Sequence, residues 1–343
     1  MNPCYSDEGF EILFAEAGKS YGALPAHVDQ QISWLNEHNA LPEKSTVLDI
    51  GCYEGDFLTR LPDSVQKIGV DVDRAAIERG RAKSLPGQLE LISDKFEHFS
   101  LEGEPPGLIT MIHVLEHLSD PVGVLKHLRR LAKDSTQLFV EIPILEYGET
   151  NDVNGFFSIQ HLTHFSKHTI AECLQKSGWT IKFSEEVAEY RAYRILAIAD
   201  KTQEKFSYST GSPEDLAAAY RSLHSWFSAL IAIEQRISQL PAARKILFWG
   251  GGAHLECLFQ VTSIFKVFGE SEFLLIDTDK AKQGKTWRGI EIMDPSILAT
   301  MDWKNTELII SSYGSQEIIA EALAAMGVPE KHVHKLYSYI SRY

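Results

Sequence analysis

Three histidines in two short motifs are the residues best suited to proton transfer in this 343-residue chain. His113 opens the motif His-Val-Leu-Glu-His at 113–117, and His161 and His164 lie in Gln-His-Leu-Thr-His-Phe-Ser at 160–166. Because imidazole has a pKa near neutrality, each of these side chains could remove a proton from a reacting group. His161 is the first candidate for the base, with His113 and His164 behind it. The alternative for His161 is structural, as a residue that caps or orients the following helix.

A second set of residues has the spacing of a ligand-binding loop. Asp49 lies in a short apolar run, Gly51 and Gly55 bracket the loop that follows, and a helical period begins just beyond it. Glycines let the backbone approach a ligand, and the N-terminus of the following helix would face that ligand. Asp71 ends the next predicted strand, about 20 residues on, where a carboxylate that binds ribose hydroxyls is expected.

The elements that position these residues alternate between strand and helix. After the strand at 47–50, the sequence predicts strands at 67–71, 89–94, 108–113 and 138–143, helices at 74–83 and from Pro121, and a closing antiparallel hairpin at 180–199. This alternation predicts a parallel sheet with helices on both faces. Since ligands bind at the carboxyl ends of such strands, His113 should face the ligand.

The loop, Asp71 and the motif at 113–117 together resemble the class I S-adenosylmethionine-dependent methyltransferases over residues 45 to 200. Members of that family usually carry a further glycine where this chain has Tyr53. Because tyrosine disfavours positive φ, we expect the loop to pass Tyr53 in an ordinary conformation.

The resemblance implies S-adenosyl-L-methionine as the cofactor and a set of residues that contact it. These residues are Asp49, Gly51, Tyr53, Gly55, Asp71, Asp94 and His113. Asp94 stands where the family places an acid near the adenine amino group, which a carboxylate can bind as a hydrogen-bond acceptor. The alternative is that Asp94 caps the N-terminus of a helix.

The motif at 160–166 resembles that of sugar C-methyltransferases that act on nucleotide-linked ketosugars. This chain keeps their histidine as His161, but it has Gln160 in place of a glutamate and His164 in place of a tyrosine. Gln160 is accordingly a candidate for substrate binding. The glutamate and tyrosine are functional in that family, and their replacement leaves C- and O-methylation open.

A second strand–glycine loop–helix pattern begins near residue 244. Its glycines are Gly250, Gly251 and Gly252, and an acidic strand end follows at Asp277. This part resembles the C-terminal domain of the same sugar C-methyltransferases. The loop lacks the spaced third glycine of a dinucleotide fingerprint, so we expect a substrate phosphate there rather than NAD. The alternative is a purely structural domain that shapes the binding site.

The predicted fold class is therefore α/β, a Rossmann-like methyltransferase domain and a smaller Rossmann-like domain joined by a helical linker. The segments are an N-terminal helical segment at 1–43, the methyltransferase domain at 44–200, a linker with connecting helix at 201–242 and the C-terminal domain at 243–343. The first segment is either a lid, with Tyr21 as its contact, or a helical layer on the sheet. Residues 213–240 are predicted to form one long helix or a hairpin, and their aromatic stripe is predicted to be core rather than a ligand platform.

Composition excludes several classes of partner. A net charge of −14 argues against a general nucleic-acid or anionic-membrane surface. No apolar run approaches the ~20 residues of a membrane span, and the first residues lack a signal peptide. The four separated cysteines predict neither a disulfide framework nor a cysteine-based zinc site, and no other metal site is predicted. A cytoplasmic location is expected, and the oligomeric state stays open.

These inferences predict an S-adenosylmethionine-dependent methyltransferase acting on a small molecule, a nucleotide-linked sugar or a related intermediate. A base would remove a proton from carbon or oxygen while the protein positions the acceptor for in-line transfer. The alternative is a non-catalytic module that binds S-adenosylmethionine or serves as a scaffold in a biosynthetic complex.

Overall fold

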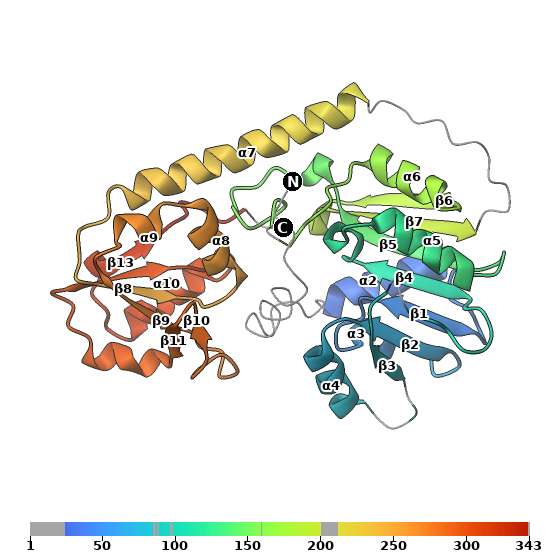
Figure 1. Cartoon of the computed structure of the whole chain (residues 1–343), viewed down its shortest axis with the longest axis horizontal. Helices are drawn as coiled ribbons and strands as arrows, with labels where there is room; N and C mark the ends of the chain where they lie inside the picture. Colours follow the sequence, from blue (N-terminus) through green and yellow to red (C-terminus); the bar gives the residue numbers. More distant parts are fainter. Residues whose placement is uncertain are drawn as a thin grey trace.

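The structure is a computed structural model that describes residues 25–84, 87, 89–96, 99–158, 160–199 and 212–341. Most of the predicted segment at 1–43, Tyr21 included, lies outside the described residues. The described chain forms two lobes, each built on one sheet, and a long helix runs alongside both of them (Figure 1).

The sheet of the first lobe has the strand order β3-β2-β1-β4-β5-β7-β6. Its strands are β1 Thr46–Ile50, β2 Gln66–Asp71, β3 Glu90–Ser93, β4 Leu108–Ile112, β5 Gln137–Pro143, β6 Trp179–Val187 and β7 Ala192–Ala199. The five strands from β3 through β2, β1 and β4 to β5 pair in parallel. Strand β7 is antiparallel to both of its neighbours, β5 and β6. The predicted parallel sheet and closing hairpin are confirmed. The order reverses between β1 and β4, so their carboxyl ends are the expected ligand site.

Helices cover both faces of this sheet. They are α2 Pro25–Glu37, α3 Asp56–Thr59, α4 Arg74–Lys83, α5 Pro121–Leu131 and α6 Lys167–Lys176, with short 3-10 turns η1 Leu115–His117, η2 Leu145–Tyr147 and η3 Ala188–Tyr190. The apolar residues of α5 and α6 share a core with Leu48 and Ile50, and those of α2, α3 and α4 share the other core with Val47. Alternate residues of one buried strand thus serve the two faces.

The described part of the N-terminal segment is a helical layer on the sheet. Val28 and Leu35 of α2 are buried against strand residues that include Phe139, and Trp34 stacks at a tilt on the same ring. For residues 25–37 the structure therefore favours the helical layer over the lid.

The helix after the first glycine loop is much shorter than the sequence predicted. α3 has only 4 residues, because Pro62 lies two residues beyond its C-cap Arg60 and cannot continue a helix. So short a helix does not provide the anion-binding N-terminus that we expected after Gly55. Any ligand contact at this loop must come from the loop itself.

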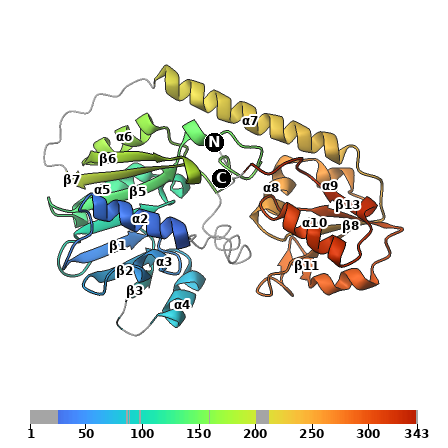
Figure 2. The same ribbon diagram turned by 180° about the vertical axis from the view of Figure 1, so that it is seen from behind.

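The connecting segment is one helix, α7 Pro213–Ile237, with a capping box between Ser212 and Asp215. Its predicted apolar stripe is core only in part. Ile233 and Ile237 are buried in the second lobe, whereas Tyr220 is 71% and Phe227 53% exposed. The prediction of a buried stripe was wrong for these aromatics, because α7 extends past the second sheet to the first lobe (Figure 2) and keeps an outward face.

The second lobe has the strand order β10-β11-β9-β8-β12-β13. Its elements are β8 Lys245–Trp249, α8 Ala253–Val261, α9 Ile264–Val267, β9 Glu272–Ile276, β10 Thr286–Trp287, β11 Ile290–Met293, η4 Pro295–Thr300, β12 Thr306–Ile310, α10 Gln316–Ala325, η5 Glu330–His332 and β13 Val333–Lys335. β8 lies between β9 and β12, all parallel, so this smaller sheet is also Rossmann-like. The predicted fold class is confirmed.

A loop of the first lobe is packed into the second lobe. Val153 is fully buried in the core beneath β8, and its carbonyl accepts a hydrogen bond of 2.9 Å from the indole of Trp226 on α7. Asn151 accepts a hydrogen bond from the Tyr313 hydroxyl (2.5 Å). The segment that precedes the His161 motif is thus held by both the connecting helix and the second lobe.

Among the helices of the described part of the chain, none combines the length and the apolar character that crossing a membrane requires.

Candidate functional site

The loop after β1 has an unusual backbone conformation at three positions. Gly51, Tyr53 and Gly55 all have positive φ, at 75°, 52° and 85°. A Cβ atom on Gly51 would come within 2.3 Å of Cγ2 of Val114, which follows β4. The loop therefore passes so close to the end of β4 that only glycine fits there.

The expectation of an ordinary conformation at Tyr53 was wrong. Tyr53 adopts the left-handed conformation that a glycine would take, and its side chain contacts Arg79 of α4. Its hydroxyl accepts a hydrogen bond from Arg79 (3.2 Å), whose guanidinium also lies 5.6 Å from the ring centroid. Arg79 is itself fixed by an ion pair of 2.6 Å with Glu54. Tyrosine at position 53, where the related family usually has glycine, thus keeps the backbone conformation that a glycine would give the loop.

Asp71 at the end of β2 binds the loop through backbone amides. Its Oδ2 accepts from the amide of Tyr53 and its Oδ1 from the amide of Asp73, both at 2.8 Å. Burial raises the pKa of this carboxyl, against the effect of these amides. A carboxylate has about four lone-pair sites, so two remain that could accept ribose hydroxyls.

Asp94 lies beside Asp71 at the end of β3 with an exposed side chain, and its amide donates to the carbonyl of Asp71 (3.1 Å). Its carboxylate accepts from the amide of Lys95 (2.8 Å), and no helix begins there among the described residues. The amide of Phe99 donates to the carbonyl of Lys95 (3.1 Å), as in a helical turn, so the helix-cap alternative for Asp94 stays open. An adenine contact by Asp94 stays a prediction.

Asp49 is placed inside the sheet rather than in the loop. Its side chain is 3% exposed, and Oδ1 accepts a hydrogen bond of 2.6 Å from the hydroxyl of Thr110 on β4. Burial raises the pKa of Asp49 to about 7. The residue therefore ties β1 to β4 beneath the loop, and any effect on a cofactor would be indirect.

His113 lies directly after β4, with φ at 53° and a side chain that is 40% exposed. Its Nδ1 lies 3.4 Å from Oε1 of Glu116, and its Nε2 lies 3.7 Å from Oε1 of Glu141. Burial would lower the pKa of His113, but the two carboxylates outweigh burial and raise it. An accessible imidazole between two carboxylates therefore lies at the carboxyl end of β4, and its contact with a ligand stays a prediction.

Glu141 is a functional candidate that sequence reasoning missed. It is fully buried on β5, where it accepts from Arg194 of β7 (2.6 Å) and from Gln31 of α2 (2.7 Å), and it pairs with His27 (2.6 Å). Burial would raise its pKa, yet His27, His113 and Arg194 hold it at about 2. An acid in the middle of an apolar strand was the available signal.

Glu116, His117 and His161 form a second cluster that joins the two histidine motifs. Glu116 is 2% exposed; burial alone would raise its pKa, but the histidines around it lower it to about 2. The rings of His117 and His161 lie 5.0 Å apart. Burial lowers the pKa of His161 to about 4, so this ring is neutral at pH 7.

His164 and Gln160 are less accessible than the sequence suggested. The His164 ring packs between Phe156 and Phe157, and burial lowers its pKa. Gln160 is 2% exposed, and its carbonyl accepts from His117 (3.0 Å). Substrate contacts by these two side chains stay predictions.

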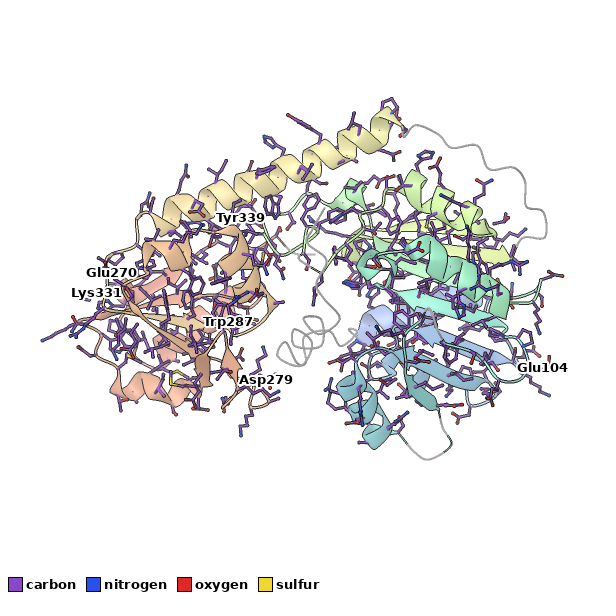
Figure 3. All side chains as sticks on the ribbon, viewed as in Figure 1. Glu104, Glu270, Asp279, Trp287, Lys331 and Tyr339 are labelled. Carbon is purple, nitrogen blue, oxygen red and sulfur yellow. The ribbon has the colours of Figure 1, made fainter. Side chains whose placement is uncertain are left out.

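The glycine loop of the second lobe repeats the contacts of the first. The amide of Gly251 donates to Oδ2 of Asp277 (2.9 Å), and the amide of Asp279 donates to Oδ1 (2.8 Å). Lys282 pairs with the same carboxylate at 3.2 Å, beside Gly252. Asp279 lies on the side of the second lobe that faces the first lobe (Figure 3).

Comparison with known proteins agrees with this geometry. The family model described as a methyltransferase domain matches residues 27–182. The sheet order and the loop after β1 agree with this match to a methyltransferase domain.

Among curated proteins, a ubiquinone biosynthesis O-methyltransferase of Stutzerimonas stutzeri is 28% identical over 113 residues, 32% of this chain and 48% of the relative. The corresponding protein of Pseudomonas aeruginosa PAO1 is 27% identical over 114 residues, 32% of this chain and 49% of the relative. The alignments thus span about half the length of these relatives.

Two solved structures show a low similarity to part of this chain. Magnesium protoporphyrin IX methyltransferase of Synechocystis PCC 6803, with bound S-adenosylhomocysteine, is 17% identical, with a TM-score of 0.43 over 57% of this chain and 95% of its own. An S-adenosylmethionine-dependent methyltransferase of Aquifex aeolicus is 18% identical, with a TM-score of 0.42 over 52% of this chain and 100% of its own.

Proposed function

We propose that this protein transfers the methyl group of S-adenosylmethionine to an oxygen or carbon of a small molecule. The observation that carries the proposal is the loop after β1. Gly51 leaves no room for a side chain beside the end of β4, and the Asp71 carboxylate, fixed by two amides, keeps capacity for two further hydrogen bonds. These features fit the adenosyl portion of the cofactor, with Asp71 on the ribose and Asp94 on the adenine.

The acceptor would lie at the carboxyl ends of β4 and β5, and His113 is the leading proton acceptor there. Its ring is accessible and is held between Glu116 and Glu141. His161, the first candidate from the sequence, donates from Nδ1 to the Phe156 carbonyl (2.8 Å) and belongs to the Glu116 cluster. We therefore rank His161 and His164 after His113 as candidates for the proton acceptor.

The finer proposal is that the acceptor is nucleotide-linked and that the second lobe binds its phosphates. Its support is the glycine loop at Gly250, Gly251 and Gly252 with Lys282 beside it. The Asp277 carboxylate already occupies the Gly251 amide and pairs with Lys282, so a phosphate would have to compete with it. Lys282→Ala should then weaken the binding of a nucleotide-linked acceptor while leaving the binding of the cofactor unaffected.

The test has two parts. Calorimetric titration with S-adenosylhomocysteine measures cofactor binding, and mass spectrometry detects the gain of one methylene on two acceptor panels, nucleotide-linked sugars and catechols. Methylation in either panel supports the proposal and names the acceptor class. Binding without transfer in both panels would favour the alternative, a non-catalytic binding or scaffold module. No binding would overturn the proposal.

A further inference from the structure

The cluster of Glu116, His117 and His161 is assembled from two segments that the backbone fastens together. Glu116 and His117 lie on η1 after β4, and His161 lies in the loop after β5. The amides of Leu162 and Thr163 donate to the Glu116 carbonyl at 2.8 and 3.0 Å. One ligand atom from each side chain of the cluster lies within 4.8 Å of the other two. The arrangement is therefore fixed by main-chain contacts and does not depend on flexible side chains alone.

Hydrogen bonds determine which ring nitrogen carries the proton in both histidines. Nδ1 of His117 lies 3.0 Å from the carbonyl of Gln160, and Nδ1 of His161 lies 2.8 Å from the carbonyl of Phe156. A carbonyl oxygen only accepts, so each Nδ1 is the protonated nitrogen and donates to it. In the neutral ring this places the lone pair on Nε2. An imidazole whose other nitrogen donates to a backbone carbonyl is the usual form of a metal-binding histidine.

The carboxylate of Glu116 is buried without a hydrogen-bond donor among the described residues. It is 2% exposed, and neither oxygen accepts a hydrogen bond from the described residues. The nearest imidazole nitrogens are Nδ1 of His113 at 3.4 Å and Nε2 of His117 at 3.9 Å. Burying a charged group without hydrogen bonds is costly, so an unobserved cation or proton is expected between these atoms.

We propose that Glu116, His117 and His161 bind one divalent transition-metal cation of the Zn²⁺ type. Two imidazole nitrogens and one carboxylate, with a further position open, are a recurrent ligand set of catalytic zinc and of related metals. Ligand distances of about 2.0–2.2 Å require the three ligand atoms, which lie within 4.8 Å of one another, to move inward. In the proposed reaction, on which this role rests, the open position would take an oxygen of the acceptor and make its proton easier to remove.

The direct test measures metal binding to the untagged full chain. After treatment with a chelator and its removal, Zn²⁺ is titrated calorimetrically, the bound metal is counted by elemental analysis, and Co²⁺ is followed by its visible d–d absorption. We expect one equivalent of Zn²⁺ and a Co²⁺ spectrum of a four- or five-coordinate site with nitrogen and oxygen ligands. Mg²⁺, which prefers octahedral oxygen ligands, should not compete.

Single variants identify the ligands. Glu116→Gln, His117→Ala and His161→Ala should each weaken Zn²⁺ binding by at least about 100-fold. Mutation of a residue that only hydrogen-bonds to a metal ligand already lowers metal affinity by about 10–100-fold. His224→Ala, an exposed histidine on α7, is the matched control and should bind as the wild type does. Thermal melts in the presence of chelator show whether each variant is folded, and the Co²⁺ spectrum of the wild type tests the site without any variant.

The outcomes separate this inference from the proposed function. Absence of stoichiometric Zn²⁺ and of the Co²⁺ spectrum, or full binding by all three variants, would overturn the metal site and leave an imidazolium as the partner of Glu116. S-adenosylhomocysteine binding and methyl transfer by the chelator-treated protein would then still support the proposed function. Stoichiometric Zn²⁺ without cofactor binding would support the metal site and refute the proposed function.

Discussion

The backbone amide of Tyr53 donates a hydrogen bond of 2.8 Å to Oδ2 of Asp71, while Tyr53 itself adopts a left-handed conformation with φ at 52°. One contact thus sets the shape of the loop after β1 and the orientation of the carboxylate beside it. In the second lobe, Gly251 and Asp277 make the same contact at 2.9 Å. Two loops of the same design, one with tyrosine and one with glycine at the donor position, make a matched pair for experiment.

Replacement of Asp71 with alanine should weaken S-adenosylhomocysteine binding by roughly 1.5–3 kcal/mol, because charge-assisted hydrogen bonds to ribose hydroxyls are lost. Isothermal calorimetry provides the measurement. Asp277→Ala, which removes the equivalent carboxylate from the second lobe, is the control and should leave this affinity unchanged. Equal affinity of wild type and Asp71→Ala would refute the cofactor assignment.

Substitutions of Tyr53 should separate its backbone from its side chain. Tyr53→Gly keeps the amide and suits positive φ, so we expect S-adenosylhomocysteine binding to persist and stability to change by about 1 kcal/mol or less. Tyr53→Pro removes the amide donor and fixes φ near −65°, so binding should be lost. Binding by the proline variant with wild-type affinity would show that the contact between Tyr53 and Asp71 does not shape the site.

Much of this architecture was readable from local sequence signals. The apolar run of β1, the loop glycines and Asp71 lie within one strand–loop–strand unit, and their spacing alone indicated the site. The left-handed conformation of Tyr53 was not predictable from its residue type, since it accompanies a backbone hydrogen bond to Asp71 of β2 and a side-chain contact with Arg79 of α4. Local propensity was overridden there by a tertiary contact.

The two buried carboxylates were harder to interpret because their partners are remote in sequence. Glu141 meets Gln31 and Arg194, which lie 110 and 53 residues away. Glu116 meets His161 only because the loop after β5 returns to η1. No periodicity or short motif encodes such contacts, so they require the folded structure.

The Glu141 cluster leads to a prediction about stability. Glu141→Gln should destabilise the protein by about 3–5 kcal/mol, because Arg194, itself 3% exposed, would keep its charge with only the half-exposed Glu185, 4.0 Å away, as a counter-charge. Urea unfolding followed by circular dichroism measures the change. The exposed pair of Arg74 and Glu78 is the control, and Glu78→Gln should cost less than about 1 kcal/mol. Similar costs for the two variants would contradict the assigned importance of the buried cluster.

Asp49 should make stability depend on pH. Its pKa is about 7 in the folded protein against an ordinary value of 3.8, because burial disfavours the charged form. Below pH 3.8 both states are protonated; between about pH 4 and 7 only the unfolded state ionises, so the contribution of Asp49 to stability falls as pH rises. Above pH 7 the loss is complete.

Asp49→Asn removes this titration and keeps an oxygen for the Thr110 hydroxyl. The free energy of unfolding of the wild type minus that of the variant should therefore be lower at pH 8 than at pH 5, by up to about 2.7 kcal/mol. Urea unfolding at the two pH values gives the comparison, with Glu78→Gln as an exposed control. A difference that does not change with pH would show that Asp49 does not titrate in this range.

His113 is expected to contribute to methyl transfer rather than to folding or cofactor binding. Asparagine is the appropriate replacement, because it tolerates the left-handed conformation at φ 53° and an alanine would add backbone strain. A positioned base typically contributes ~10²–10⁴-fold, so His113→Asn should lower the single-turnover rate by about that factor. S-adenosylhomocysteine affinity and melting temperature should remain close to the wild-type values. His224→Asn on the exposed face of α7 controls for the substitution, and a normal rate in His113→Asn would refute the assignment of His113 as the proton acceptor.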